Sequence, residues 1–344
     1  MSTLPVDVAM PLPFCLRLED GDYKIRYKGR VYLCRLCKVW SDFASGCNPD
    51  KDVGPISTEL LFKVTTGQIT KALNCEIEFD KKGFFRYTVF STRVYFDEGS
   101  ELEEIVDRVS KDPLIVIRTL LPLINKLLVA YRYVTGEFHV TEIQWPDLCM
   151  VRDGKMMPWV TMDYPTRDHQ RRKVMGWFPG DESPVITTRP NVSKRGHKTI
   201  ETLMLQKDFQ PPLERDLLLN SKDFSRQGRH GLAVFELGTA LEIAVNKVLL
   251  DKGVDEEELR KLRFKEKYDT ALLRYAGVSL KGARNDLWSA VLKIWNIRNN
   301  VAHRRLAAFT DRKGTIVERI ESKSQVQPLI SATEHTLGYL DSIR

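Results

Sequence analysis

An arginine, an asparagine and a histidine stand close together near the C-terminus, in the stretch Arg298-Asn299-Asn300-Val301-Ala302-His303. An arginine keeps its positive charge, and its planar guanidinium group can hold two phosphate oxygens at once. An unperturbed histidine titrates near pH 6.5, so it can accept or donate a proton at neutral pH. These side chains are typical of a site that binds a phosphate and moves protons.

The three side chains lie at the polar end of a predicted helix, 286–305. Two apolar rows run along this helix at spacings of three and four residues. Arg298 is the next position of the first row, Asn299 is the next position of the second, and His303 follows Asn299 by one turn. Both rows should be buried, and a buried arginine is costly unless it is paired or used. The rows consist of Leu287, Val291 and Ile294, and of Trp288, Leu292 and Trp295.

The rest of residues 200–344 also has a helical pattern, which predicts an all-α bundle of about five helices. The clearest amphipathic pattern is that of residues 229–251. Pro328 suits the first turn of a last helix, 328–343. Two further helices are predicted over 213–226 and 268–275.

The arrangement Arg298-Asn299-xxx-His303 resembles the R-polar-x-x-x-H motif of HEPN domains, and the resemblance extends over roughly residues 205–344. The run Ala233–Glu242 is similar to the second long helix of such domains. The motif is short, and the order of the surrounding features adds to its specificity. Those further features are Phe264–Lys267, Leu272-Leu273 and Gly277–Leu280.

The resemblance implies a dimeric helical domain in which the motifs of two subunits meet in one cleft. Many HEPN proteins are metal-independent endoribonucleases, and several act in antiphage defence or as toxins. Carried over by position, Arg298 and His303 would be catalytic and Asn299 supporting, with no metal or cofactor. Glu242 is a secondary candidate that could orient His303 or pair with Arg298. RNA would be cleaved by its own 2′-hydroxyl, and two histidines from a homodimer would supply the acid and the base.

Residues 1–164 predict an α+β domain with a mostly antiparallel sheet and one central helix. A hairpin is expected at Asp20-Gly21-Asp22, and Phe84–Phe96 is rich in aromatic and β-branched residues. The central helix follows Asp112, and Pro122 should kink or split it. No phosphate-binding glycine loop stands in this domain, so sensing, substrate selection or binding of a protein partner all remain open.

Cys34 and Cys37 form a CxxC pair, followed by Cys47, which invites a zinc hypothesis. The segment around the pair has the pattern of a strand, in which positions three apart point to opposite faces. The sequence contains no clear second ligand pair. A metal site is therefore not predicted.

Residues 165–199 carry eight basic and three acidic side chains, contain four prolines and three glycines, and show no periodicity. This composition predicts a basic linker between the two domains. A basic segment can follow a phosphate backbone, although it can equally be a solvated linker. The predicted RNA contacts are Arg171, Arg172, Lys173, Lys194 and Arg195, together with Arg304 of the helical domain.

Two other interpretations stay open. The helical domain could be a catalytically inactive RNA-binding or dimerisation module, or the protein could be an interaction subunit whose partner carries the chemistry. Met1–Cys15 lacks the basic start and continuous apolar run of a secretory signal, and the most apolar stretch, Leu114–Val134, contains three basic residues. The sequence therefore predicts a cytoplasmic protein without a membrane span.

Overall fold

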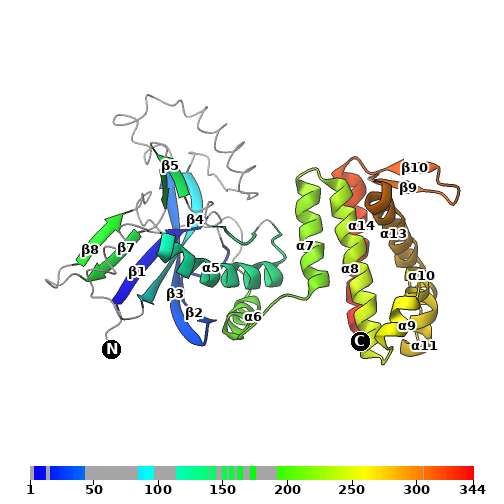
Figure 1. Ribbon diagram of the computed structural model, residues 1–344, viewed down its shortest axis with the longest axis horizontal. Helices are drawn as coiled ribbons and strands as arrows, with labels where there is room; N and C mark the ends of the chain where they lie inside the picture. The colour runs from blue at the N-terminus through cyan, green and yellow to red at the C-terminus, as the bar shows by residue number, and fades with distance from the viewer. Residues whose placement is uncertain are drawn as a thin grey trace. The chain divides into compact units, whose positions relative to one another are not determined.

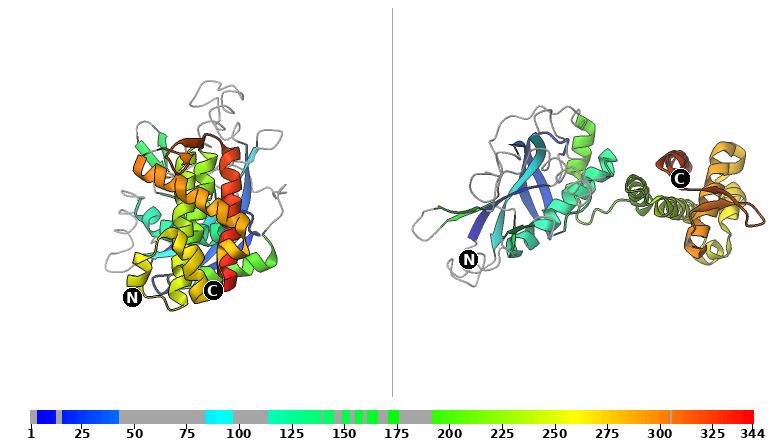
Figure 2. Two further views of the ribbon diagram at one scale, coloured as in Figure 1. Left: turned by 90° about the vertical axis from the view of Figure 1, so that its right-hand side faces the viewer. Right: turned by 90° about the horizontal axis from the view of Figure 1, so that it is seen from above.

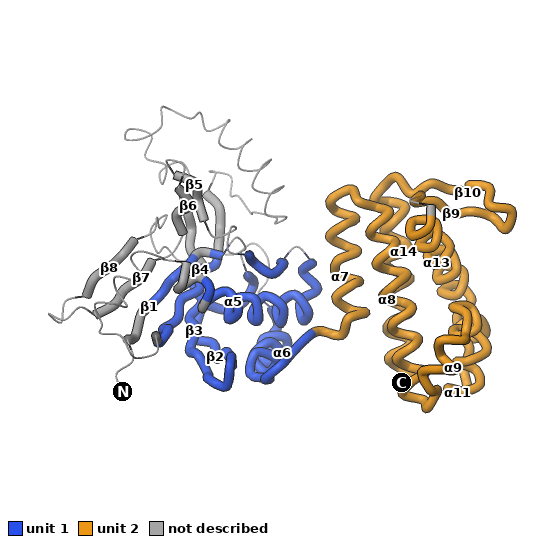
Figure 3. Tube along the Cα trace, viewed as in Figure 1, with its two compact units in different colours: residues 1–210 blue, residues 211–344 orange. Residues whose placement is uncertain are grey.

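The computed structural model divides into two compact units, 1–210 and 211–344 (Figures 1 and 3). None of the helices in the described part of the chain is long and apolar enough to cross a membrane. The structure describes residues 4–12, 16–42, 84–96, 114–138, 140–144, 149–152, 155–158, 161–165, 171–175, 192–304 and 306–344.

The first unit contains a six-stranded sheet with the strand order β2-β3-β4-β1-β7-β8, and every neighbouring pair is antiparallel. Figure 2 shows the strands fanned across one another, the twist that chirality imposes on a sheet. A separate pair is formed by β5 (Cys149–Arg152) and β6 (Lys155–Pro158). The six strands are β1 (Leu4–Pro11), β2 (Gly21–Tyr27), β3 (Arg30–Asp42), β4 (Phe84–Phe96), β7 (Thr161–Pro165) and β8 (Arg171–Met175).

The hairpin lies one strand later than predicted. Gly21 already belongs to β2, where it pairs with Leu36, so the expected turn at Asp20-Gly21-Asp22 is wrong. The turn is made by Lys28 and Gly29, which both have positive φ. Such a two-residue turn matches the right-handed twist of the strands that it joins.

Two helices cover one side of the sheet, α5 (Leu114–Thr135) and α6 (Lys194–Leu205) (Figure 2). The predicted central helix is α5, and it continues through Pro122 without a break. Pro122 removes one helical hydrogen bond, to the carbonyl of the exposed Arg118, where water can replace it. The fold class predicted for this domain, a mostly antiparallel sheet with a helix, is confirmed.

The predicted linker is wrong in part. Strand β8 falls within residues 165–199 and closes one edge of the sheet, paired with β7. Helix α6 begins within the same segment, and its Ile200 and Met204 are fully buried in the core of the first unit. The unit boundary therefore lies at Gln210/Pro211 instead of near residue 200. The prolines and glycines of this segment predict a linker. Its short elements form because they are buried against strands that are distant in the sequence, and the local composition does not show this burial.

Cys34 and Cys37 both lie in β3, as the strand pattern predicted. The Cys34 side chain is fully buried in the core, and burial raises the pKa of its thiol to about 12. A thiol that stays protonated at neutral pH is a poor metal ligand. Among the described residues no group of three or more His, Cys, Asp or Glu could hold a metal ion, and Cys47 lies outside them.

The second unit is largely helical, which confirms the prediction in outline. Helix α8 lies at its centre and contacts α7, α13 and α14. The unit also contains a small hairpin of β9 (Ala308–Thr310) and β10 (Ile316–Arg319), which an all-α domain would lack. The helices are α7 (Leu213–Arg226), α8 (His230–Asp251), α9 (Glu256–Lys261), α10 (Phe264–Glu266), α11 (Leu272–Ala276), α12 (Leu280–Ala283), α13 (Asn285–Arg304) and α14 (Lys323–Ile343).

The last helix begins five residues before the predicted start at Pro328. The side-chain oxygen of Gln325 accepts the backbone N–H groups of Glu321 and Ser322, at 2.9 and 3.1 Å, and so caps the helix at Ser322. Pro328 therefore lies inside the helix and not in its first turn. Hydrogen bonding at the cap outweighed the preference of proline for the first position.

Candidate functional site

Helix α13 carries the predicted motif, and its first apolar row is buried as expected, with Leu287, Val291 and Ile294 in the core of the helical unit. Trp288 is also buried, whereas Leu292 and Trp295 are half-buried. The row analysis placed Arg298 and Asn299 on faces that should be covered, and both are half-buried. The motif thus lies where the packed part of the helix gives way to its solvated end.

Arg298 lies against helix α8 at Gly238. A methyl group in place of the Gly238 hydrogen would lie 2.8 Å from both Cβ and Cγ of Arg298. Only glycine leaves room for the stem of the arginine at this crossing. The guanidinium carbon lies 4.8 Å from the ring centroid of Trp295 and 5.4 Å from that of Phe235. Two aromatic rings and one glycine therefore set the path of this side chain.

The ring of Trp295 is itself held in place. Phe264, buried in α10, stacks on it with a centroid separation of 4.0 Å and an angle of 1° between the planes. A stacked pair of this kind restricts the tryptophan to one orientation. Phe264 of α10 therefore supports Arg298 indirectly, because it holds the Trp295 ring that the guanidinium group contacts.

The guanidinium group has polar neighbours as well. Its Nη1 donates to Oδ1 of Asn299 at 3.2 Å, and its Nη2 lies 3.7 Å from Oε2 of Glu242. Its Nε is buried and has no hydrogen-bond partner among the residues that the structure describes. The Arg298 side chain is 23% exposed. The arginine is therefore partly satisfied by the fold and keeps part of its surface open to solvent.

Glu242 lies between two cations. Its Oε2 faces Arg298, and its Oε1 lies 3.9 Å from Nζ of Lys267. Gly231 of α8 lies against Val301, while Gly238 lies against Arg298, so α8 and α13 run antiparallel. Glu242 therefore stands beyond Arg298 on the side away from His303. Of the two roles suggested by the sequence, the geometry fits pairing with Arg298 and not the orientation of His303 within one chain.

His303 is exposed near the end of α13, and its side chain makes no hydrogen bond or ion pair with any residue in the described ranges. It follows Arg298 by five residues, which places it about 140° further around the helix and about 7.5 Å along it. Asn299 lies one turn before His303 on the same face. The fold thus groups Arg298, Asn299 and Glu242, and leaves the imidazole apart from them.

Asn300 is a residue of this helix that the sequence analysis did not single out. It is buried, and its Nδ2 donates to the Ala308 carbonyl at 2.8 Å and to Oγ1 of Thr310 at 3.1 Å. Asn296, one turn earlier, accepts the backbone N–H of Thr310 at 2.9 Å. In the sequence, the only sign of these hydrogen bonds to strand β9 is a pair of asparagines one turn apart on a predicted helix. They fasten strand β9 to the end of α13 that carries the motif.

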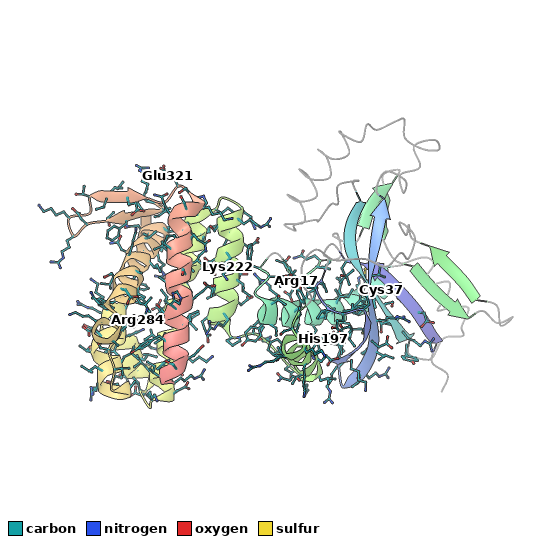
Figure 4. All side chains as sticks on the ribbon, turned by 180° about the vertical axis from the view of Figure 1, so that it is seen from behind. Arg17, Cys37, His197, Lys222, Arg284 and Glu321 are labelled. Carbon is teal, nitrogen blue, oxygen red and sulfur yellow. The ribbon has the colours of Figure 1, made fainter. Side chains whose placement is uncertain are left out.

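An open hollow of about 630 Å³ lies next to this end of α13. His230, the first residue of α8, lines it, and the histidine Nδ1 is buried without a partner among the described residues. Figure 4 shows Glu321, another lining residue, beside the β9–β10 hairpin and well away from Arg284 at the start of α13. The remaining lining residues are Gly228, Arg229, Gly231, Leu232, Val301, Ala307 and Ile320.

The predicted RNA contacts are divided between the two units. Arg171, Arg172 and Lys173 form part of strand β8, and their side chains lie outside the described residues, as does that of Arg304 at the end of α13. Lys194 and Arg195 are exposed in the first turn of α6. The five residues predicted in the linker therefore belong to strand β8 and helix α6 of the first unit, and Arg304 belongs to helix α13 of the second.

Comparisons of the chain with protein-family models, with curated proteins and with solved structures found no match.

Proposed function

We propose that the helical unit is a metal-independent endoribonuclease of HEPN type, which acts as a homodimer through Arg298 and His303. The observation that carries this proposal is that one helix presents both a pre-positioned, partly open guanidinium group and an exposed imidazole that has no partner among the residues that the structure describes. The hollow beside this end of α13 has room for part of a nucleotide chain and is lined by Val301 of the same helix, but by none of the motif side chains. Asn299 supports the reaction by accepting a hydrogen bond from Arg298.

The proposed reaction is an internal phosphoryl transfer. The ribose 2′-oxygen forms a bond to phosphorus while the bond to the 5′-oxygen of the next nucleotide breaks. A neutral histidine accepts the 2′-hydroxyl proton, and a protonated histidine gives a proton to the departing 5′-oxygen. Arg298 stabilises the charge that develops on the non-bridging oxygens. The products are a 2′,3′-cyclic phosphate and a 5′-hydroxyl.

One histidine cannot be both base and acid in the same step, which gives a chemical reason for a dimer. A second copy of α13 would bring a second His303, and the exposed position of this residue leaves it accessible to a partner. In this proposal the first unit selects the RNA or responds to a trigger.

A second function is favoured by one contact. Glu242 lies near the guanidinium group of Arg298 and offsets part of its charge. A purely structural ion pair would have the same appearance. The second candidate is therefore an RNA-binding or dimerisation module without catalysis, for which RNA binding should weaken steeply with salt and no RNA should be cleaved.

The test is incubation of the purified full chain with total RNA in EDTA, followed by mapping of the new ends. We expect cleavage with 2′,3′-cyclic phosphate and 5′-hydroxyl ends, and its loss in His303→Ala and Arg298→Ala. His335→Ala is the matched control, because His335 is also exposed on a helix of the same unit. Unchanged cleavage by both motif variants would contradict the assignment, and binding without cleavage would favour the second candidate.

A further inference from the structure

Lys267 is a lysine in an unusual place. Its side chain is only 8% exposed, and it is the first residue of a π-helical turn, Lys267–Ala271, between α10 and α11. π-Helical turns are rare and often mark functional positions. The next residue, Tyr268, is fully buried and donates its hydroxyl to the Leu241 carbonyl at 2.7 Å. The turn is thereby fastened to α8 directly beside Glu242.

The carboxylate of Glu242 is shared between two cations. The separations, 3.9 Å to Lys267 and 3.7 Å to Arg298, are both longer than a hydrogen bond, so neither cation holds the carboxylate alone. Glu242 is the one acidic group paired with Lys267 among the residues that the structure describes. The three side chains together carry one net positive charge. Without the lysine, the carboxylate and the arginine would form a neutral pair.

We propose that Lys267 is a positioning residue for phosphate binding. Its ammonium group offsets the charge of the Glu242 carboxylate, so that the site around Arg298 keeps a net positive charge toward RNA. The inference rests on the proposed function, because it assumes that Arg298 meets a phosphate. It assigns a role to a residue outside the motif, and it explains why a lysine occupies a buried position where an apolar side chain would avoid the cost of desolvation.

The electrostatics of the lysine agree with this role. Burial lowers the pKa of Lys267, and the nearby Glu242 offsets part of that loss. The carboxylate of Glu242 therefore favours the charged form of Lys267.

The test measures binding of a fluorescein-labelled single-stranded RNA by the full chain in a His303→Ala background, which prevents cleavage. Lys267→Met should weaken binding about two- to fivefold at low salt, the size expected for one unit charge acting across a partly solvated site, and less at high salt. Lys265→Met is the matched control, because Lys265 is exposed two residues away and no ion pair joins it to Glu242. It should change binding by less than Lys267→Met does.

The double variant Lys267→Met, Glu242→Gln separates charge from packing. It removes one charge of each sign and returns the site to a net charge of +1, so RNA affinity should recover to near the parent value. If Lys267→Met has no effect, or if the double variant binds no better than the single one, the inference is overturned. Thermal melting of each variant should show a folded protein, since replacing a buried lysine by methionine removes a desolvation cost.

Arg298→Gln in the same background distinguishes failure of the role proposed for Lys267 from failure of the proposed function. If it weakens RNA binding and Lys267→Met does not, the role of Lys267 fails while the proposed function stands. If Arg298→Gln also leaves binding unchanged, RNA is not the ligand of this site, and both are contradicted.

Discussion

The two ends of the motif are built differently. Arg298 is enclosed by two aromatic rings, a glycine and a carboxylate, whereas His303 stands in solvent without a partner among the described residues. The fold therefore positions the guanidinium group, which we propose binds phosphate, and leaves exposed the imidazole, which we propose transfers protons. A site with one prepared half and one open half would be incomplete in a single chain. In our proposal, a second copy of the same helix completes it.

The largest expected effects are on the rate of RNA cleavage, and the melting temperature should distinguish the two halves of the motif. His303→Ala should lower the rate of RNA cleavage by about 10²–10⁴-fold, the usual contribution of a general acid or base, and leave the melting temperature unchanged because the side chain is exposed. Arg298→Ala should lower the rate by a comparable factor and also reduce stability, because it removes contacts to Trp295 and Phe235. A drop in melting temperature for His303→Ala alone would contradict the comparison.

Gly238→Ala tests the enclosed half from the opposite helix. The added methyl group would overlap the stem of Arg298, so the two helices must separate or the arginine must move. We expect a loss of about 2 kcal/mol in the free energy of unfolding, together with reduced cleavage. Gly338→Ala is the control, since a methyl group at this exposed position in α14 meets nothing within 4 Å. It should be neutral or stabilising by up to about 1 kcal/mol.

Adjacent asparagines offer a finer comparison. Asn300→Ala removes hydrogen bonds that join α13 to strand β9, and should cost about 1–2 kcal/mol of stability. Asn299→Ala removes only the acceptor for Arg298, so it should leave chemical denaturation nearly unchanged and reduce cleavage. If the two variants lost stability equally, the division between a structural and a functional asparagine would be wrong.

The sequence was sufficient for the local part of this site. The apolar spacing along α13 predicted the buried first row, because helical periodicity is a local property. The second row and Arg298 were also expected to be buried, but Leu292, Trp295 and Arg298 are half-buried. The sequence did not predict Gly238 or Phe235 as neighbours of the arginine, or Lys267 as a neighbour of Glu242. Those contacts depend on the crossing of α8 with α13 and on a π-helical turn, and neither has a periodic signature.

The same distinction explains the errors in the fold. The proline and glycine around strand β8 and helix α6 predict a linker, yet Ile200 and Met204 are buried by residues distant in sequence. Pro328 predicts a helix start at its own position, but the capping side chain of Gln325 begins α14 five residues earlier. Tertiary burial determined the structure of the first segment, and capping determined the start of the last helix. Residue propensities alone indicate neither of these fully.

The most direct test of the central claim mixes wild-type chains with His303→Ala chains, allows subunits to exchange, and measures RNA cleavage in EDTA against the wild-type fraction. If two His303 side chains act together, the rate should follow the square of the wild-type fraction, because mixed dimers are inactive. A linear dependence would contradict a site shared between two chains. Cleavage that is unaffected by the variant would contradict the role of His303 itself.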